Sequence, residues 1–461
     1  MKKILLFAII LVPFLIRAQD ITGKWNGLLK VQNMELTLVF HISKEDSEFS
    51  TIMDSPDQKA IGIATSSTSF KNSTLIIEIA ELGARYKGQY NDGVFEGTFY
   101  QVNQSFPLNL TTNEVAKKKL NRPQEPKKPY PYFSEEVSFP GGAPDVKLAG
   151  TLTIPKGEGP FAVAVLISGS GPQNRDEEFL THKPFLVLSD YLTRKGIAVL
   201  RYDDRGFAAS TGNHATATSE DFANDVRAAI AYLKTRNEID QEHIGLIGHS
   251  EGGLIAPMVA ATNTDLAFIV LLAGPGVPGD QILLKQSELI GKASGLNEND
   301  IQKELTMGRN IFELFHKYGE SDSFEIMLRE YLEDAITEEN KIPGEKTKEE
   351  YIQLLMSPFK MPWYRYFISY DPAKVLRQVQ CQVLALNGSL DVQVAPENLE
   401  YIEKAIKEGG NKKVTIKEYP NMNHLFQKCI TGSLDEYPTI EQTIDPMVLN
   451  DISNWIEKQI K

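Results

Sequence analysis

The sequence has few cysteines, no surplus of positive charge and no apolar run long enough to cross a membrane. Its 461 residues carry a formal net charge of −13, which disfavours nucleic acid and anionic membrane surfaces as partners. The two cysteines and seven histidines show no zinc-type spacing, so we expect neither a metal nor a cofactor. The apolar run at residues 4–16 is shorter than the ~20 residues of a spanning helix, so we expect no stable membrane insertion.

The first residues are typical of an export signal. Lys2 and Lys3 precede the apolar run, and Ala18 supplies a small residue for cleavage. We therefore expect residues 1–18 to be a signal peptide and the protein to be periplasmic or extracellular. A membrane anchor is the alternative, although no cysteine follows the run to carry a lipid.

An exported protein can hold a disulfide. Cys381 is expected to open a strand, whereas Cys429 is expected beyond a loop at the opposite end of the neighbouring strand. Because a disulfide needs Cα atoms within ~7 Å, this placement disfavours a bridge.

Periodicity and composition divide the rest of the chain. Residues 19–112 contain short alternating runs bounded by Asn, Asp or Gly, which predict a small β-barrel or sandwich domain. Residues 113–131 are rich in Pro and Lys and predict a solvated linker. Residues 132–461 alternate strand and helix patterns, which predict a mostly parallel sheet covered on both faces. Within them, residues 277–370 show only amphipathic helical patterns, which predict a helical cap.

The stretch IGLIGHSEGG, residues 244–253, contains the pattern G-x-S-x-G centred on Ser250. Five letters alone match by chance in roughly one such chain in eight. Here a strand pattern precedes the serine and a helix pattern follows it, as a nucleophile elbow requires. The helix N-terminus would also favour a developing oxyanion. Ser250 is therefore the predicted nucleophile, and a degenerate, inactive hydrolase fold is the alternative.

A nucleophilic serine needs a base, and the base needs an acid to orient it. In this type of sheet the chain order is Ser, acid, His, and only His316 and His424 follow Ser250. His316 lies in a helical pattern of the cap, whereas His424 follows the last strand pattern and is the predicted base. Asp391 follows the strand pattern CQVLALNG and is the predicted acid. Asp371 precedes a proline and is expected to cap a helix instead.

Two backbone N–H groups are expected to bind the oxyanion. One belongs to Glu251, which follows the nucleophile, and the other to Ser170 in SGSGPQNRDE; a plain glycine turn is the alternative for the second. Asp203 and Asp204 in RYDDRGFAAST are expected to brace a loop with neighbouring arginines rather than hold a metal. His249 is expected to be structural.

The stretches LISGSGPQNRDE, RYDDRG, GLIGHSEGG, LALNGSLDVQV and NMNHLFQ resemble the α/β-hydrolase superfamily. They are most similar to the exported two-domain bacterial carboxylesterases of the EstD type, near the serine aminopeptidase-like hydrolases. The resemblance covers roughly residues 130–461, and the N-terminal β-domain is similar to the one that such proteins carry. It implies an α/β-hydrolase fold with Ser250 as nucleophile, Asp391 as acid and His424 as base. RGFAAST departs from the family, which often has a glycine in place of an alanine, and this bears on the shape of that loop.

The triad and the resemblance predict a carboxylesterase that works through an acyl-enzyme on a small-molecule or glycan-linked acyl ester. A serine aminopeptidase or peptidase with the same triad is one alternative, and a binding protein with an inactive triad is another. Trp363 and Tyr364, in MPWYRYFISY, are candidate pocket residues, and packing of the cap onto the core is an equal alternative for them. The sequence does not indicate the oligomeric state, the acyl-chain length or the leaving group.

Overall fold

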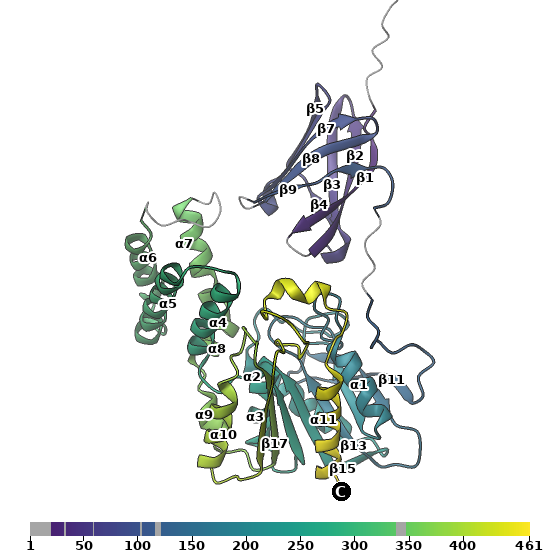
Figure 1. Cartoon of the computed structure of the whole chain (residues 1–461), viewed down its shortest axis with the longest axis vertical. Coiled ribbons are helices and arrows are strands. Elements are labelled where there is room, and N and C mark those ends of the chain that lie inside the picture. Colours follow the sequence, from purple (N-terminus) through teal and green to yellow (C-terminus); the bar gives the residue numbers. More distant parts are fainter. Residues whose placement is uncertain (1–19, 32–33, 59, 102–103, 116–120, 338–346) are drawn as a thin grey trace, which may run out of the picture. The chain divides into compact units, whose positions relative to one another are not determined.

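The structure is a computed structural model that describes residues 20–31, 34–58, 60–101, 104–115, 121–337 and 347–461 (Figure 1). The predicted signal peptide, residues 1–18, lies outside these ranges. The chain divides into two compact units, Met1–Lys118 and Lys119–Lys461, and the division falls inside the predicted linker. No helix in the described ranges is long and apolar enough to span a membrane.

The first unit is a closed β-barrel. Its strands follow the order β10-β1-β2-β3-β5-β6-β7-β8-β9, with β4 paired to β3, and β10 also pairs with β8, so the sheet closes on itself. This closure decides between the barrel and the sandwich that the sequence left open. The described strands are β1 (Gly23–Val31), β2 (Met34–Glu45), β3 (Glu48–Ser55), β4 (Ala60–Ala64), β5 (Ser67–Lys71), β6 (Thr74–Ile79), β7 (Ala84–Asn91), β8 (Val94–Gln101), β9 (Gln104–Pro107) and β10 (Leu110–Thr111).

Side chains of the barrel itself fill its interior. Inward positions alternate with exposed ones along strands such as β7, as a pleated strand requires. Tyr86 is fully buried, and two glycines make room for it: a Cβ at Gly88 or Gly97 would lie 2.2 or 2.4 Å from its hydroxyl oxygen. Trp25 packs edge-to-face on Phe95 with ring centroids 4.6 Å apart. The barrel therefore has a packed aromatic core.

The second unit is built on an eight-stranded sheet of order β11-β12-β14-β13-β15-β16-β17-β18. Two pairings, β11–β12 and β12–β14, are antiparallel, and the pairings from β14 to β18 are parallel. The sheet is thus mixed, and the prediction of a mostly parallel sheet was too simple. Residues 141–146 join β11 to β12 by a connection too short for a parallel crossover.

The strands of this sheet are β11 (Phe133–Pro140), β12 (Lys147–Ile154), β13 (Phe161–Ile167), β14 (Ala198–Tyr202), β15 (Ile239–His249), β16 (Phe268–Leu272), β17 (Gln382–Gly388) and β18 (Val414–Tyr419). The apolar run of β13 shows why they form a buried sheet. Val163, Val165 and Ile167 enter one core and Ala164 and Leu166 enter the other, so both faces of the strand are buried.

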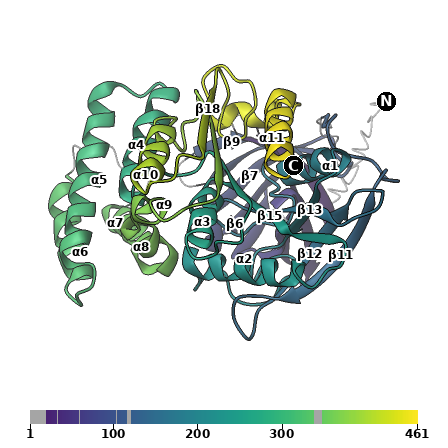
Figure 2. The same cartoon turned by 90° about the horizontal axis from the view of Figure 1, so that it is seen from below.

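Helices cover both faces of the sheet (Figures 1 and 2). Helices α1 (Pro184–Arg194) and α11 (Pro446–Gln459) contribute to one core. Helices α2 (Ser219–Leu233), α3 (Glu251–Ala260) and α10 (Asn398–Glu408) contribute to the other. The short helix α9 (Pro372–Leu376) packs on α3 and α10.

An insertion between β16 and β17 forms a helical cap. Its described helices are α4 (Gly279–Ala293), α5 (Glu298–Tyr318), α6 (Phe324–Ala335), α7 (Lys348–Met356) and α8 (Pro362–Ser369). Phe315, Phe324 and Phe359 pack together at their centre. Figure 2 shows these helices gathered on one side of the hydrolase unit, beside α9 and α10. Helix α8 contacts α2 and so joins the cap to the core.

The second half of the predicted linker docks on the hydrolase unit. Arg122 donates to the carbonyl oxygens of Ile440 and Leu180, and the side chain of Gln124 donates to the carbonyl oxygen of Ile444 at 2.6 Å. This part of residues 113–131 is therefore held against the protein rather than fully solvated as predicted.

Candidate active site

Ser250 lies at a sharp turn between β15 and α3. Its backbone angles, φ 53° and ψ −116°, are a conformation that residues other than glycine rarely adopt. The turn is sterically tight, since a Cβ at Gly248 would lie 1.9 Å from the carbonyl oxygen of Gly252. A Cβ at Gly252 would lie 2.1 Å from the carbonyl oxygen of Ile167. Both glycines of the G-x-S-x-G pattern are thus required by the close approach of strand and helix.

Asp391 and His424 form a buried pair. His424 Nδ1 lies 2.7 Å from Asp391 Oδ2, and the two side chains are 5% and 0% exposed. Asp391 Oδ1 accepts hydrogen bonds from the backbone N–H groups of Gln393 and Val394 at 2.8 and 2.9 Å. These donors fix the orientation of the carboxyl group, so that Oδ2 faces Nδ1 of His424. With the ring proton on Nδ1, Nε2 of His424 is left as the basic nitrogen.

The sheet places the three predicted triad residues along one edge. Ser250 follows β15, Asp391 follows β17 and His424 follows β18, and these strands are parallel, so their carboxyl ends meet there. His249 directly precedes Ser250 in the chain, and its ring centroid lies 4.6 Å from that of His424. It therefore connects the serine elbow with the loop that carries His424. The catalytic roles of the three residues belong to the proposal below.

The two residues set aside from the triad have other partners. His316 Nε2 lies 2.8 Å from Asp280 Oδ2 within the cap. Asp371 caps α9 by accepting from the backbone N–H of Ala373 at 3.1 Å, as predicted.

The loop between β13 and α1 passes directly against the elbow. A Cβ at Gly169 would lie 3.2 Å from Ser250 Cβ. The N–H of Gly169 already donates to Glu177 Oε1 at 2.8 Å, whereas Ser170, the next residue, is exposed. Glu251 is the first residue of α3. Glu251 thus directly follows Ser250, and Ser170 lies on the loop that touches the elbow. That their N–H groups bind an oxyanion stays a prediction.

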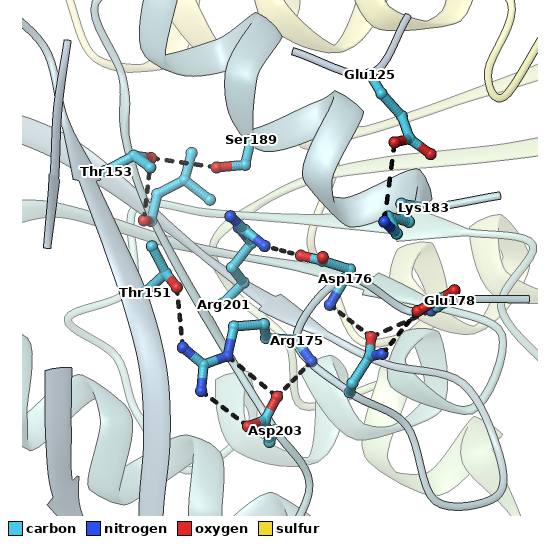
Figure 3. A network of polar contacts seen from close by, with 12 residues as sticks. Glu125, Thr151, Thr153, Arg175, Asp176, Glu178, Lys183, Ser189, Arg201 and Asp203 are labelled. Atoms are coloured by element: carbon cyan, nitrogen blue, oxygen red, sulfur yellow. Dashed lines mark hydrogen bonds and ion pairs between the residues drawn. The ribbon is translucent and has the colours of Figure 1, made fainter. Parts of the chain in front are cut away.

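A polar network holds this loop in place (Figure 3). Arg175 donates to both carboxylate oxygens of Asp203, at 3.1 and 2.8 Å, and to Thr151 Oγ1 at 3.0 Å. The hydrogen bonds that Arg175 donates to Asp203 raise the pKa of Arg175. Arg201 pairs with Asp176 on the same loop. The expected bracing role of Asp203 is confirmed.

A small pocket beside the elbow contains buried carboxyl groups, and its lining includes Ser168, Asp204, Phe222, Glu251 and Ile255. Asp204 accepts from Ser168 Oγ at 2.6 Å and from the backbone N–H of Gln173 at 2.8 Å. Burial, aided by the negative charges of Glu251 and Glu177, raises the pKa of Asp204 to about 8. Asp204 thus braces the loop, and its raised pKa favours the neutral carboxyl.

Glu251 connects the elbow to the cap. Its Oε1 accepts from Ser219 Oγ at 2.6 Å and from Trp363 Nε1 at 2.7 Å, and burial raises its pKa. Trp363 also stacks on Phe367, with centroids 5.2 Å apart. Tyr364 instead packs edge-to-face on Phe359 inside the cap. Of the two candidate pocket residues, only Trp363 contacts the residue that follows Ser250 in the described structure.

The raised pKa of Asp204 predicts a pH-dependent effect of Asp204→Asn. The unfolded aspartate ionises near pH 4 and the folded one near pH 8, so the wild type loses stability as the pH rises through that window. Asparagine keeps the shape of the neutral acid and avoids this loss. We expect Asp204→Asn to raise Tm relative to wild type at about pH 9 and to change it little at about pH 4. Each kcal/mol gained in the free energy of unfolding should raise Tm by ~2–4 °C.

Thermal unfolding at both pH values measures this difference, and Asp265→Asn, at a side chain 67% exposed, serves as the control. An Asp204→Asn effect equal at the two pH values would contradict the assignment.

Two of these contacts were not predicted from the sequence. Glu177 closes the stretch LISGSGPQNRDE and Trp363 lies in MPWYRYFISY, but neither stretch indicates that these side chains reach His249 and Glu251. Cys381 and Cys429 are both free, as expected. Within the described ranges, no group of three or more His, Cys, Asp or Glu side chains is arranged to hold a metal ion.

The strand order and the strained serine elbow define the class of protein as one with the α/β-hydrolase fold. The family model described as serine aminopeptidase, S33, matches residues 183–298, which include Ser250. Esterase EstD of Thermotoga maritima is 27% identical over 318 residues, which cover 68% of this chain and 66% of EstD. The chain therefore spans just under two thirds of that relative's length. An uncharacterised 31.7 kDa protein of Escherichia coli is 26% identical over 222 residues, 47% of this chain and 70% of that one.

Similar solved structures include an esterase of Pyrococcus furiosus, Pf2001, with a TM-score of 0.44 at 15% identity, covering 75% of this chain and 100% of that one. An acylaminoacyl peptidase of Pyrococcus horikoshii has a TM-score of 0.43 at 13% identity, covering 92% of this chain and 62% of that one. The fold assignment rests on strand order and the elbow rather than on these superpositions.

Proposed function

We propose that the protein is a serine hydrolase that cleaves carboxylic esters through an acyl-enzyme. The observation that carries the proposal is the buried His424–Asp391 pair at the sheet edge that also holds the strained Ser250 elbow. The printed name of the EstD relative supports an ester as the substrate.

In this mechanism the chain's own residues perform every step. Ser250 Oγ attacks the ester carbonyl carbon while Nε2 of His424 takes its proton, and Asp391 stabilises the resulting imidazolium. The N–H groups of Ser170 and Glu251 bind the oxyanion. His424 then protonates the leaving alcohol, and a water molecule activated by His424 releases the acid from the acyl-enzyme.

Trp363 is proposed to form one wall of the substrate site. Its indole N–H bonds to the carboxyl of Glu251, so the ring stands near the nucleophile. Tyr364 is assigned a weaker part, because it packs on Phe359 and burial raises its pKa to about 12. The substrate is proposed to be a small-molecule or glycan-linked ester. Export is proposed from the sequence of residues 1–18 alone.

An aminopeptidase is the second candidate. The match to a serine aminopeptidase family model favours it, as does the carboxyl of Glu251 beside the elbow. Such an enzyme needs an ionised acid to hold the substrate ammonium group. Glu251 Oε1 already accepts two hydrogen bonds, and its raised pKa disfavours the charged form, so we rank this candidate below the esterase.

A direct comparison of substrates separates the two. For the expressed full chain, we expect kcat/KM for p-nitrophenyl acetate to exceed that for alanine p-nitroanilide by at least about 10²-fold. The ester assay is repeated over a series of acyl-chain lengths. N-acetylation of the anilide is the control, because an aminopeptidase needs the free amine and an esterase does not. Turnover of the free-amine anilide at or above the ester rate, lost on acetylation, would favour the aminopeptidase.

A further inference from the structure

The residue before the nucleophile, His249, is held at both ring nitrogens. Its Nδ1 lies 2.9 Å from Glu177 Oε1, and its Nε2 lies 3.0 Å from the backbone carbonyl oxygen of His424. The side chains of His249 and Glu177 are 9% and 4% exposed. A second carboxylate–imidazole pair is thus buried beside the His424–Asp391 pair.

Both partners of the His249 ring are acceptors. A carbonyl oxygen and an ionised carboxylate oxygen cannot donate a hydrogen bond, whereas a neutral imidazole carries a single N–H. A neutral His249 would therefore leave one ring lone pair facing an oxygen in a buried site, which costs free energy. When Glu177 is ionised, only the imidazolium, with a proton on each nitrogen, satisfies both contacts.

Glu177 supplies the compensating charge and a third link. Its Oε1 also accepts the N–H of Gly169 at 2.8 Å. One oxygen thus joins His249 to the loop between β13 and α1, residues 168–183, which carries the proposed donor Ser170 and is called the oxyanion loop below. Its Oε2 is buried without a hydrogen-bond partner in the described structure, which leaves the charge dependent on His249. Glu177 also adopts φ 51°, a strained value for a side-chain-bearing residue. A strained, buried carboxylate of this kind persists only where the surrounding contacts hold it.

We propose that the Glu177–His249 ion pair is a positioning device that holds the elbow, the oxyanion loop and the His424 loop together, and that turnover requires His249 to be protonated. The device rests on the proposed function of Ser250. It acts through Gly169, His249 and the carbonyl group of His424, and it does not touch the substrate.

The charges around His249 set the direction of its pH dependence. The groups that act on its charge are Glu177, the carbonyl group of His424 and Asp391, and the charge of Glu177 also acts on Asp204. Burial lowers the pKa of His249, but the attraction and hydrogen bond of Glu177, with smaller contributions from His424 and Asp391, outweigh it and raise the pKa. A raised histidine pKa means that the contact is complete at low pH and is lost as the pH rises through that pKa. The device therefore predicts a fall in kcat on the alkaline side.

The variant Glu177→Gln tests this device, because glutamine retains an acceptor but removes the charge. We expect kcat for p-nitrophenyl acetate to fall about tenfold or more at about pH 8, with a much smaller change in KM. We also expect the midpoint of the alkaline fall in kcat to move to lower pH. Glu178→Gln is the matched control: Glu178 is the exposed neighbour that accepts from Asn174, and its pH profile should follow the wild type.

A second readout needs no activity. In the Ser250→Ala variant, labelled-histidine ¹⁵N NMR at neutral pH should show both nitrogens of His249 protonated, with the signal assigned by its loss in His249→Asn. A neutral His249 would overturn the proposal, as would a Glu177→Gln pH profile that matches Glu178→Gln. If Glu177→Gln does not fold, the NMR result decides. An inactive wild type would contradict the esterase function and leave the protonation state of His249 as the test of the device.

Discussion

Replacing Ser250 with alanine is expected to lower kcat for p-nitrophenyl acetate by about 10⁴–10⁶-fold. The side-chain oxygen is the proposed attacking atom, and no other hydroxyl occupies the elbow between β15 and α3. Alanine should keep the backbone of the turn, since its hydrogen bond to Leu272 uses the N–H of residue 250. The residual rate should be the slow hydrolysis supported by the oxyanion donors and substrate binding alone.

Two controls make this loss specific. Ser294→Ala, at an exposed position after α4, should retain wild-type kcat. The Tm of Ser250→Ala should remain at or above that of the wild type, because replacing a functional polar side chain with alanine seldom costs stability. A Ser250→Ala enzyme that keeps more than about a tenth of wild-type kcat would remove Ser250 from the mechanism.

Asp391→Asn is expected to lower kcat by about 10⁴-fold with little change in KM. Asp391 Oδ1 is occupied by the N–H groups of Gln393 and Val394, so the amide nitrogen of asparagine would turn toward His424 Nδ1. Nδ1 of His424 would then have to accept a hydrogen bond from the amide, so the ring proton would move to Nε2. A protonated Nε2 cannot act as the base. Steady-state kinetics of the purified variant measure the loss.

Asp371→Asn provides the matched control for the acid. Asp371 has a cap role at α9, and asparagine caps a helix about as well as aspartate. It should therefore show wild-type kcat and a Tm change of no more than a few degrees. If Asp391→Asn and Asp371→Asn had equal activities, the acid of the triad would have to lie elsewhere.

Local rules were enough to predict the elbow and the cap of α9. Gly248 is required by the close approach of Gly252 within the same turn, and Gly252 by the close approach of Ile167 on β13. Both steric demands are expressed in the pattern G-x-S-x-G. Asp371 next to a proline likewise specifies a helix start within the same turn. The pairing of Asp391 with His424 was also accessible, because chain order and parallel strands bring their loops to one edge.

Long-range contacts were not accessible in the same way. The pairing of β10 with β8 closes the barrel, but β10 covers only Leu110–Thr111 and has no periodicity to read. Glu177 reaches His249 across 72 positions of the chain, from a loop whose shape depends on Arg175 and Arg201. Trp363 meets Glu251 only because the cap folds back onto α2 and α3. No local pattern encodes such contacts.

The prediction that His249 is a structural residue did not include its two ring contacts. The sequence placed it beside the nucleophile and away from the chemistry. The structure joins it to Glu177, on the loop between β13 and α1, and to the carbonyl oxygen of His424. A residue can thus be absent from the reaction and still be expected to control its geometry.

The central claim is that Ser250 forms a covalent bond with the substrate's acyl group. Labelling with a p-nitrophenyl phosphonate, an ester analogue that stays on the attacking oxygen, tests it most directly. Peptide mass spectrometry should find a single adduct, on Ser250 in IGLIGHSEGG, which is absent in Ser250→Ala and forms much more slowly in Asp391→Asn. An adduct on another residue, or equal labelling of the wild type and Ser250→Ala, would contradict the account.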